Sequence, residues 1–561
     1  MAIVIAIVFG RPPFVRQEDD IRLAALLLSG ASLLNKTPPA FTGSFQSFSR
    51  VLQGQFASQE LQNVTTLAQV LTPNATSDNA IVIPEGPTLN YAALSDEIER
   101  VAGVLAAAGV EAGRPVSIVL ANNLEFMITF LAVTRAGAIA APLNSAYTVD
   151  EFKFFMEDAD AQLAIVPPGD HAGRESANQL GIPTMDASSV GAHVVIAKSG
   201  SELKITKDVA PPSPDDIALF LHTSGTTNRP KGVPLTHKNL LTSLGNIKDT
   251  YALTPDDVAM VVMPLFHVHG LIGVALSTLY SGGSMVIPSR FSASTFWRDQ
   301  AATNATWYSA VPTIHQILLM RAEEDNAPKE SFRLIRSCSA ALVPSVFEEL
   351  EARFGAPVLE AYGMTEAAHQ MSSNLLPPGA RVPGSVGMGT GVDISIMDEA
   401  GKMVALGERA EVVIRGENVT HGYNNNPEAN AEAFTDGWFR TGDQGIMDAD
   451  GRLTLTGRLK ELINRAGEKI SPLEVDALLL DHPAVAEAVC FAVPDVKYGE
   501  IVQAAVVLNG DADEATIQAF CRERMAEFKV PERIYIADSL PRTATGKIQR
   551  RHVSAAFAPQ D

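Results

Sequence analysis

A loop rich in glycine, hydroxyl and basic side chains occupies residues 223–232 (TSGTTNRPKG). Apolar segments flank it at residues 217–221 and 233–235, so we expect it to join two strands. Backbone N–H groups and hydroxyls around a small concavity suit phosphate oxygens, and Lys231 adds a positive charge. The Walker A spacing is missing, and a strand follows where a helix should begin. A plain hairpin turn is the alternative, but such turns seldom combine these residue types. The loop therefore predicts phosphate binding.

A Tyr-Gly-Met-Thr-Glu motif at residues 362–366 follows the apolar pair Val358 and Leu359. A carboxylate beside a hydroxyl suits Mg²⁺ carried by a nucleotide, because Mg²⁺ prefers one or two carboxylates together with phosphate oxygens. The ring of Tyr362 could stack on a base. Taken alone the motif is weak, since a Thr-Glu pair that opens a helix is more often a cap.

Three further motifs follow toward the C-terminus. Residues 438–443 (WFRTGD) end in Asp443, which is placed to accept hydrogen bonds from ribose hydroxyls. Residues 457–472 (GRLKELINRAGEKISP) are rich in charge and glycine, and residues 541–549 (PRTATGKIQ) present Lys547 on a glycine-bearing tip. Each alone has a plainer interpretation as a turn, a solvated charged run or a surface lysine.

Alternating apolar runs and amphipathic stretches must position these motifs. Residues 80–83, 116–120 and 138–144 are short apolar runs typical of buried strands. Between them, residues 91–109 and 123–137 repeat apolar residues at helical spacing. Strands separated by helices of this length predict a mainly parallel sheet covered on both faces.

The pattern changes after about Val392. Residues 394–406 and 446–458 are strand–turn–strand units with glycine at the turn, which predicts antiparallel hairpins or a small barrel. The last hundred residues or so return to mixed α/β character. With 561 residues the chain is too long for one hydrophobic core, and we expect three to four compact units.

Composition excludes several functional classes. Hydrophobic residues make up 46% and charged residues 19%, which is ordinary for a globular protein. A net charge of −21 argues against a broad nucleic-acid or anionic-membrane surface, so we expect no nucleic-acid partner. Three widely separated cysteines, Cys338, Cys490 and Cys521, indicate reduced thiols in an intracellular enzyme.

The N-terminal residues 1–9 are apolar but lack a basic leader, and Arg11 follows too soon for a transmembrane span. A weak targeting segment, an extension of the fold and a misassigned start codon remain alternatives. The C-terminal Ala-Pro-Gln-Asp is not a peroxisomal address. We therefore expect a cytoplasmic protein without a transmembrane segment, as a monomer or homodimer.

Together the five motifs, in this order and spacing, resemble the adenylate-forming superfamily of acyl-CoA synthetases, luciferases and peptide-synthetase adenylation domains. The resemblance covers roughly residue 67 to the C-terminus. It implies an α/β fold with a large N-terminal domain of parallel-rich αβ layers and a small β-barrel subdomain, followed by a small mobile α+β C-terminal domain. We expect an N-terminal extension at residues 1–60, an adenylation domain at 61–456 and a C-terminal lid domain at 457–561.

The resemblance also implies roles for matching residues. Glu366 and Thr226 would hold Mg²⁺, and Asp443 would bind the ribose with help from Arg458. Lys460 would be the hinge, and Lys547 would bridge the substrate carboxylate and the α-phosphate. The implied catalytic residues are Lys547, Lys231, Thr226, Glu366 and Arg458. The implied contacts to ATP and coenzyme A are Thr223, Ser224, Gly225, Thr226, Thr227, Lys231, Ala340, Ala341, Glu360, Ala361, Tyr362, Gly363, Met364, Thr365, Asp443, Arg458, Lys460, Gly467, Lys469 and Lys547.

The implied reaction depends on neutralising charge. A carboxylate attacks the α-phosphorus of ATP and pyrophosphate leaves, so two anions must approach each other between Mg²⁺, Lys231 and Lys547. In this family the small domain then rotates, and the thiol of CoA attacks the acyl-adenylate. Ala466 and Gly467 leave room for a thin pantetheine arm, and Arg465 and Lys469 could meet CoA phosphates.

The expected acid is oxalate. Residues 264–270 (PLFHVHG), 304–315 and 336–341 border the acyl pocket in the family, and with His222 and residues 369–373 they look like the oxalate:CoA ligase branch. A second carboxylate in a mostly dry pocket needs donors or a positive charge. His267 is the first candidate, followed by Ser337 or Ser339 and then Ser309. A malonate pocket would be expected to use arginine.

Other interpretations stay open. These polar residues could merely hydrogen-bond to the backbone beside the nucleotide. The chain could be a medium-chain fatty acid or aromatic acid:CoA ligase, or an inactive adenylate-binding regulatory protein. It could also be a fatty acyl ligase anchored to a membrane through its apolar N-terminus. The intact set of Lys231, Glu366, Asp443 and Lys547 favours an active enzyme.

Overall fold

The structure, a computed structural model, describes residues 65–67, 69–70, 78–223, 230–542 and 548–558, all within the unit Val64–Asp561. The expected N-terminal extension, residues 1–60, lies outside the described residues. So do four residues of the expected phosphate loop, Ser224, Gly225, Thr226 and Thr227, and the expected catalytic lysine, Lys547.

The first large sheet contains the strand that carries the Tyr-Gly-Met-Thr-Glu motif. Its interior strands run parallel, while β2, β16 and β17 are antiparallel additions at its two ends. In spatial order the strands are β17 (Met388–Gly389), β16 (His369–Ser373), β15 (Val358–Met364), β14 (Leu334–Ser337), β13 (Trp307–Ala310), β11 (Val258–Met260), β12 (Ser284–Val286), β1 (Asn79–Val82) and β2 (Thr88–Asn90).

The second large sheet ends in the hairpin that carries the glycine-rich loop. Strands β9, β4, β3, β5 and β6 pair in parallel, and β10, β7 and β8 are antiparallel. The spatial order is β10 (Lys231–Thr236), β9 (Ile217–Thr223), β4 (Ile139–Pro142), β3 (Pro115–Ile118), β5 (Leu163–Val166), β6 (Thr184–Val190), β7 (His193–Lys198) and β8 (Ser201–Glu202). The expected parallel pairing is confirmed, but it is divided between two sheets whose ends are antiparallel.

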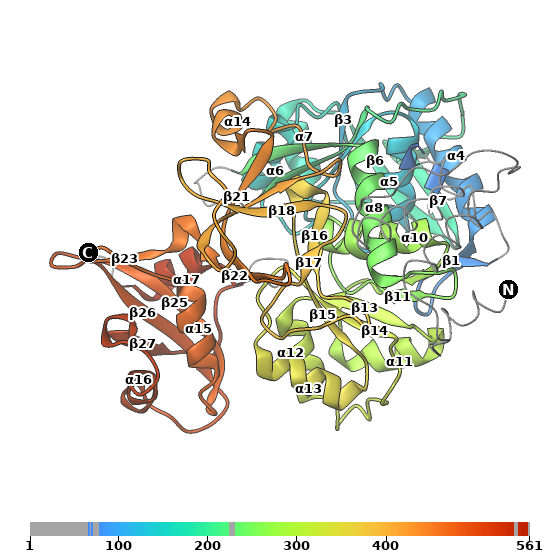
Figure 1. Ribbon diagram of the computed structural model, residues 1–561. Helices are drawn as coiled ribbons and strands as arrows, with labels where there is room; N and C mark the ends of the chain where they lie inside the picture. Colours follow the sequence, from blue (N-terminus) through green and yellow to red (C-terminus); the bar gives the residue numbers. More distant parts are fainter. Residues whose placement is uncertain (1–64, 68, 71–77, 224–229, 543–547, 559–561) are drawn as a thin grey trace, which may run out of the picture. The chain divides into compact units, whose positions relative to one another are not determined.

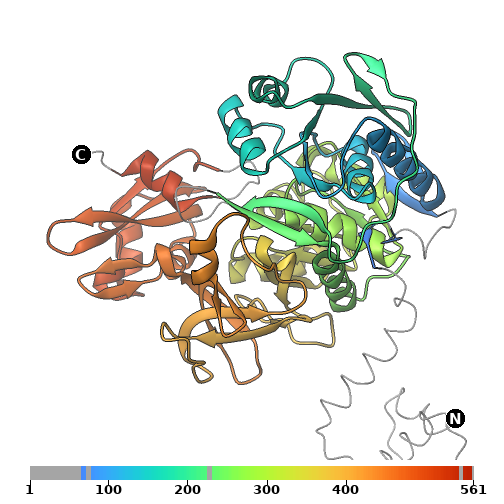
Figure 2. The ribbon, with the colours of Figure 1, turned by 90° about the horizontal axis from the view of Figure 1, so that it is seen from above.

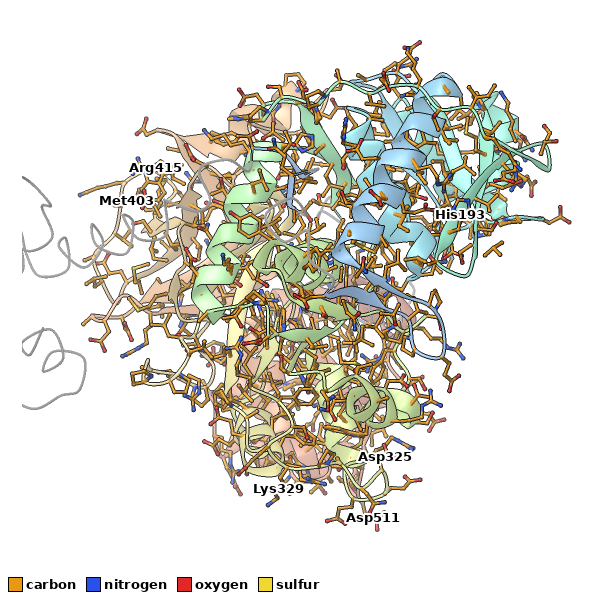
Figure 3. The ribbon with its side chains drawn as sticks, turned by 90° about the vertical axis from the view of Figure 1, so that its right-hand side faces the viewer. His193, Asp325, Lys329, Met403, Arg415 and Asp511 are labelled. Carbon is orange, nitrogen blue, oxygen red and sulfur yellow. The ribbon has the colours of Figure 1, made fainter. Side chains whose placement is uncertain are left out.

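The two helices predicted from apolar spacing are present. Helix α4 (Tyr91–Ala107) begins after Asn90, whose side chain accepts a hydrogen bond from the N–H of Ala93. Helix α5 (Leu124–Arg135) begins after Asn123 in the same way. Figure 3 shows His193 of β7 beside α4, where its Nδ1 lies 3.3 Å from a carboxylate oxygen of Glu97.

Further helices cover the two large sheets. Figure 1 shows α11 (Ala293–Thr303), α12 (Pro312–Met320) and α13 (Pro344–Phe354) beside β13, β14 and β15. They share a core of aromatic side chains that includes Phe296, Trp297 and Tyr308. The remaining helices of this part are α6 (Val149–Asp158), α7 (Ala172–Leu180), α8 (His237–Tyr251), α9 (Val268–Gly270), the π-helix η2 (Leu271–Leu276), α10 (Ser277–Ser281) and the 3₁₀ turn η3 (Thr365–Ala367).

A small antiparallel sheet follows, as the glycine-bearing hairpins predict. Its strands are β18 (Asp393–Met397), β19 (Arg409–Arg415), β21 (Trp438–Met447), β20 (Phe434–Thr435) and β22 (Leu453–Arg458), with α14 (Pro427–Ala433) beside them. Strands β21 and β22 form the hairpin expected at residues 446–458. All five strands belong to one sheet.

The C-terminal residues form an α+β group, as expected (Figure 2). This group has its own hydrophobic core. Its sheet pairs β25 (Val485–Asp495) with β26 (Gly499–Leu508), and β27 (Arg533–Ile536) lies parallel to β26. The other elements are η4 (Leu459–Glu461), β23 (Ile463–Arg465), β24 (Glu468–Ile470), α15 (Pro472–Leu480), α16 (Glu514–Arg522), η5 (Glu527–Lys529) and α17 (Arg550–Phe557). Within the described ranges, none of the helices has the length and apolar character that a bilayer crossing requires.

Candidate active site

The hairpin of β9 and β10 holds the two ends of the glycine-rich loop together. Thr223 and Lys231 are opposite each other in the register of the two strands. The hydroxyl of Thr223 is buried and lacks a hydrogen-bond partner among the described residues. Gly232 permits the close packing, because a Cβ there would lie 2.4 Å from the ring of Phe220. An unsatisfied hydroxyl and a lysine at the mouth of the hairpin fit an anionic ligand such as phosphate.

Glu366 lies beside this hairpin, in η3 directly after β15. Its side chain is buried, which raises the pKa of the carboxyl. Tyr423 donates its hydroxyl hydrogen to Glu366 Oε1 at 2.9 Å. The ammonium of Lys231 lies 3.8 Å from the centroid of the Tyr423 ring. Burial lowers the pKa of Lys231, while the nearby Glu366 carboxylate acts in the opposite direction. Mg²⁺ bound to a nucleotide usually takes only one or two carboxylates from the protein, so the single carboxylate of Glu366 beside the hairpin of β9 and β10 fits such an ion.

The expected ribose residues are also assembled. Asp443 and Arg458 are partners in the register of β21 and β22, and Arg458 Nε lies 2.9 Å from Asp443 Oδ1. Tyr362 donates its hydroxyl hydrogen to the other carboxylate oxygen of Asp443. Burial and this carboxylate raise the pKa of Tyr362 well above its usual value. The three side chains therefore form one polar group at the junction of the large and small sheets, in which Tyr362 and Asp443 are buried and Arg458 is partly exposed.

Other expected nucleotide contacts lie around β14 and β15. Ala340 and Ala341 are exposed after β14, while Glu360 and Ala361 are buried in β15. Burial raises the pKa of Glu360 to about 8, against the opposing effect of the N–H groups of Gly384 and Leu342. Met364 and Thr365 are half-buried. Gly363 allows a close strand crossing, because a Cβ there would lie 2.1 Å from the carbonyl oxygen of His369.

The expected CoA residues lie in the C-terminal group. Gly467 follows Ala466 in the two-residue turn between β23 and β24, and both residues have positive φ, +93° and +53°. Lys469 is exposed, and its ammonium lies 3.7 Å from a carboxylate oxygen of Glu399, in the turn that follows β18. Lys460 is exposed in η4. Within the described residues, no hydrogen bond or ion pair joins Gly467 or Lys469 to Lys231, Glu366 or Asp443. Lys460, in contrast, lies near enough to Lys231 to lower the pKa of that lysine.

A fully buried arginine, Arg336, occupies the region expected to border the acyl pocket, on β14. Its Nε donates to the Tyr251 hydroxyl at 2.7 Å, and its Nη1 donates to Ser309 Oγ at 3.0 Å. Its Nη2 donates to His369 Nε2 at 2.9 Å and to Gln370 Oε1 at 3.1 Å. These four partners are neutral acceptors, so none of them offsets the charge of the guanidinium.

Two histidines adjoin this arginine. His269 Nε2 lies 2.6 Å from Ser309 Oγ, and its Nδ1 lies 3.0 Å from Ser339 Oγ. The rings of His269 and His369 stack with centroids 5.4 Å apart. Burial, followed by the charge of Arg336, holds the pKa of both histidines well below the usual range. The cluster therefore carries one lasting positive charge, on Arg336.

The candidate His267 lies at the edge of this cluster. Its Nδ1 accepts the backbone N–H of His269 at 3.2 Å, so His267 caps α9. Ser309 and Ser339 form hydrogen bonds with His269. Ser337 is buried with its hydroxyl unpartnered among the described residues.

The backbone around His369 is constrained to place its ring. His369 has φ of +94°, a conformation that is unusual for a residue with a side chain. Gly273 of η2 makes room for the ring, because a Cβ there would lie 2.4 Å from His369 Nε2. Such strain often marks a functional site, where surrounding contacts hold it in place.

Sequence reasoning named the segment that contains Arg336 but did not select this residue, and it missed His269 and Tyr423 as site residues. The signal for Arg336 was a charged residue inside an apolar strand and directly before Ser337. A charge at such a position is seldom buried without a partner. No comparable signal marks Tyr423, which lies far along the chain from both of its contacts.

The chain is similar to known proteins in sequence and in fold. Residues 71–424 match the family model for AMP-binding enzyme, and residues 474–547 match that for the AMP-binding enzyme C-terminal domain. An oxalate–CoA ligase of Arabidopsis thaliana is 51% identical, over 84% of this chain and 93% of its own. An oxalate–CoA ligase of Saccharomyces cerevisiae is 46% identical, over 79% of this chain and 87% of its own. The crystal structure of ATP-bound MatB from Rhodopseudomonas palustris matches with a TM-score of 0.80 and 32% identity, over 88% of this chain and 99% of that one. The chain therefore belongs to the AMP-binding enzyme family, within the adenylate-forming superfamily that its motifs resemble.

Proposed function

We propose that this ATP-dependent acid:CoA ligase acts on oxalate. It would form oxalyl-adenylate and pyrophosphate from oxalate and ATP, and then oxalyl-CoA and AMP from the adenylate and CoA. The names of the two oxalate–CoA ligases support this acid, because both relatives are similar to the chain over most of its length.

The single observation that carries the choice of a dicarboxylic acid is the buried charge of Arg336, while the choice of oxalate over malonate, for which an arginine was also expected, rests on the two relatives. A cation that is removed from water costs several kcal/mol unless an anion or strong hydrogen bonds compensate it. Its four hydrogen-bond partners are neutral. A dianionic acid would supply the missing charge, with one carboxylate near Arg336 and the other free to attack phosphorus.

The position of Arg336 in the sheet agrees with this role. Ser309 and Arg336 are neighbours in the register of the parallel strands β13 and β14, and both lie toward the carboxyl ends of those strands. Ligands of open α/β sheets bind outside the carboxyl ends of the strands. The unpartnered hydroxyl of Ser337, one residue further on, adds a donor at the same edge. A fatty acyl pocket would instead place apolar side chains there.

The adenylation step uses residues in the roles that the family resemblance implies. We assign Thr223 and Lys231 to the ATP phosphates, and Tyr362, Asp443 and Arg458 to the nucleoside. Glu366 would hold Mg²⁺, which when bound neutralises phosphate charge and orients the triphosphate. No general base is required, because a carboxylate is already ionised at neutral pH. The chain contributes to the reaction by placing its charged and polar groups where charge develops in the transition state.

The thioester step would use the C-terminal group, residues 457–561, with Lys460 as the hinge and Lys547 withdrawing after adenylation. We assign Gly467 and Lys469 to the path of CoA. The boundaries 1–60, 61–456 and 457–561 belong to the same proposal, as do a monomer or homodimer and a cytoplasmic location.

A panel of acids tests the assignment. Steady-state AMP release should be measured with oxalate, glyoxylate, acetate, malonate and octanoate at saturating ATP, Mg²⁺ and CoA. We expect kcat/KM for oxalate to exceed that for each other acid by at least about a hundredfold, the effect of about 2.7 kcal/mol. A preference for octanoate or for malonate would exclude oxalate and leave the ligase activity standing.

A further inference from the structure

One side chain contacts both Lys231 and Glu366, the charged residues assigned to the ATP phosphates and to Mg²⁺. The ring face of Tyr423 carries the Lys231 ammonium at 3.8 Å, and its hydroxyl donates to Glu366 Oε1 at 2.9 Å. The face of an aromatic ring attracts a cation, while a phenol hydroxyl is a strong donor to a carboxylate. Tyr423 therefore satisfies two groups of opposite charge with two different parts of one side chain.

The backbone of Tyr423 is fixed in place on both sides. Asn430 of α14 accepts the Tyr423 N–H at 2.6 Å and donates to the Tyr423 carbonyl oxygen at 2.9 Å. The next residue, Asn424, donates its N–H to the carbonyl oxygen of Gly232 at 2.8 Å. The segment is thus attached both to α14 and to the strand that begins with Lys231.

The segment is also attached to the turn that carries Glu366. The N–H of Thr420 donates to the Glu366 carbonyl oxygen at 2.7 Å, and the Thr420 hydroxyl donates to the carbonyl oxygen of Pro234 at 2.8 Å. Tyr423 is only 7% exposed. These contacts hold its ring at a fixed position between β10 and η3.

Opposite charges in a buried site attract strongly, because water screens them little. Without the intervening ring, the flexible lysine side chain could turn to the carboxylate and form a direct ion pair. That pair would neutralise the two charges that the proposed function assigns to the ATP phosphates and to Mg²⁺. In the described part of the chain, the ammonium lies on the ring and the carboxylate accepts the phenol hydrogen.

We propose that Tyr423 is a positioning residue that keeps Lys231 and Glu366 apart and directs each toward its own part of Mg²⁺·ATP. The hydroxyl orients the carboxylate for the metal, and the ring face holds the ammonium for phosphate. The inference rests on the proposed nucleotide site, but not on the identity of the acid.

Two substitutions separate the role of the Tyr423 hydroxyl from the role of its ring face. Tyr423→Phe keeps the ring face and removes the hydroxyl, whereas Tyr423→Leu removes both. Tyr280→Phe is the matched control, because the Lys248 ammonium also lies over the Tyr280 ring, at 5.7 Å, and neither residue is assigned to the nucleotide site. Mn²⁺ serves as a spectroscopic probe for the metal, with its binding to the protein·ATP complex followed by electron paramagnetic resonance. ATP binding without metal is measured by calorimetry.

We expect Tyr423→Phe to weaken Mn²⁺ binding by about tenfold or more, which is typical for loss of a hydrogen bond to a charged group. Its affinity for ATP without metal should stay within about threefold of the unchanged protein, since the cation–π contact remains. Its adenylation rate should be low at limiting Mg²⁺ and recover at saturating Mg²⁺, with KM for ATP nearly unchanged. Tyr423→Leu should weaken the binding of both Mn²⁺ and metal-free ATP.

Equal Mn²⁺ binding by the unchanged protein and Tyr423→Phe would overturn the proposal. So would a Tyr423→Phe variant that loses metal-free ATP binding as fully as Tyr423→Leu does, because a general loss of structure predicts that outcome. Thermal denaturation of each variant, compared with Tyr280→Phe, shows whether the fold is retained. The binding measurements contain neither acid nor CoA, so an error in the proposed acid leaves their result unchanged.

Discussion

Arg336 differs from most buried charged residues of the described chain, which have a counter-ion. Asp257, for example, is buried against Arg333 with two close contacts, at 2.8 and 3.0 Å, and is thereby compensated. Arg336 instead contacts two hydroxyls, a neutral imidazole and an amide oxygen. A guanidinium placed in this way is prepared for an anion that arrives from outside the chain.

Replacement of this arginine should change the choice of acid. In Arg336→Gln we expect kcat/KM for oxalate to fall by about two to three orders of magnitude, the loss that follows removal of one partner from a buried charge pair. The kcat/KM for glyoxylate, which lacks the second carboxylate, should fall much less. The ratio of kcat/KM for oxalate to that for glyoxylate should therefore decrease strongly. Arg415→Gln is the control, because Arg415 lies exposed on the small antiparallel sheet and its ion pair with Asp393 is also exposed (Figure 3). An equal loss for both acids would make Arg336 a structural residue.

Residues in local motifs were predictable, and residues joined only by the fold were not. Asp443 and Arg458 were both named from sequence because each lies in a recognisable motif, and the register of β21 and β22 brings them together. Tyr423 is 57 residues from Glu366 along the chain, so nothing local indicates their hydrogen bond. From the sequence, His267 rather than His269 was the first candidate for the acid, although His269 is the one that contacts the two serines. Only the start of α9 assigns one to the helix cap and the other to the serines.

At the scale of elements, short apolar runs predicted strands but could not assign them to sheets. Strands β1 and β3 both appear as buried runs around α4, yet β1 belongs to one large sheet and β3 to the other. Pairing of this kind is decided by contacts distant in sequence, which periodicity does not contain. The helices α4 and α5 were predicted more closely, because their apolar residues repeat at helical spacing, and the structure shows an asparagine cap at the beginning of each.

The turn between β23 and β24 has two explanations for its glycine. Positive φ at both Ala466 and Gly467 is the geometry of a tight hairpin turn, which favours glycine or asparagine without any ligand. The alternative is that Gly467 leaves space for pantetheine, and a Cβ there meets nothing within 4 Å. In the proposed function, Gly467 both permits the tight turn and leaves space for pantetheine.

Two substitutions at this turn separate the requirements. Gly467→Asn should keep the turn, whereas Gly467→Leu adds bulk and a strained φ that costs about 1–2 kcal/mol. We expect acid-dependent pyrophosphate exchange into ATP to survive in both variants, because exchange does not involve CoA. Thioester formation should fail in Gly467→Leu and continue, at a reduced rate, in Gly467→Asn. Normal thioester formation in Gly467→Leu would place the path of CoA elsewhere.

At the scale of the whole molecule, the buried carboxyl of Glu360 links stability to pH. Its pKa is raised from 4.5 to about 8 in the folded protein, chiefly by burial. Between these values the unfolded chain binds fewer protons than the folded one, so stability must fall as pH rises from about 4.5 to 8. Glu360 contributes roughly 1.4 kcal/mol to the free energy of unfolding for each unit by which its pKa differs between the folded and unfolded states.

Removal of this titration should flatten the pH dependence. In Glu360→Gln the Tm should change less between pH 5 and 8 than it does in the unchanged protein, as measured by calorimetry in buffers of constant ionic strength. The two proteins should differ least at pH 5, where Glu360 is largely protonated in the folded state. Parallel Tm curves for the two proteins across this range would show that Glu360 does not titrate there.

The central claim is that this chain activates oxalate on ATP before CoA takes part. Exchange of labelled pyrophosphate into ATP, with Mg²⁺ present and CoA omitted, measures that step alone. We predict exchange that depends on oxalate, saturates with it, and falls in Arg336→Gln by at least about a hundredfold in kcat/KM, as expected for a buried charge pair. Absence of oxalate-dependent exchange, or faster exchange with octanoate than with oxalate, would contradict the account.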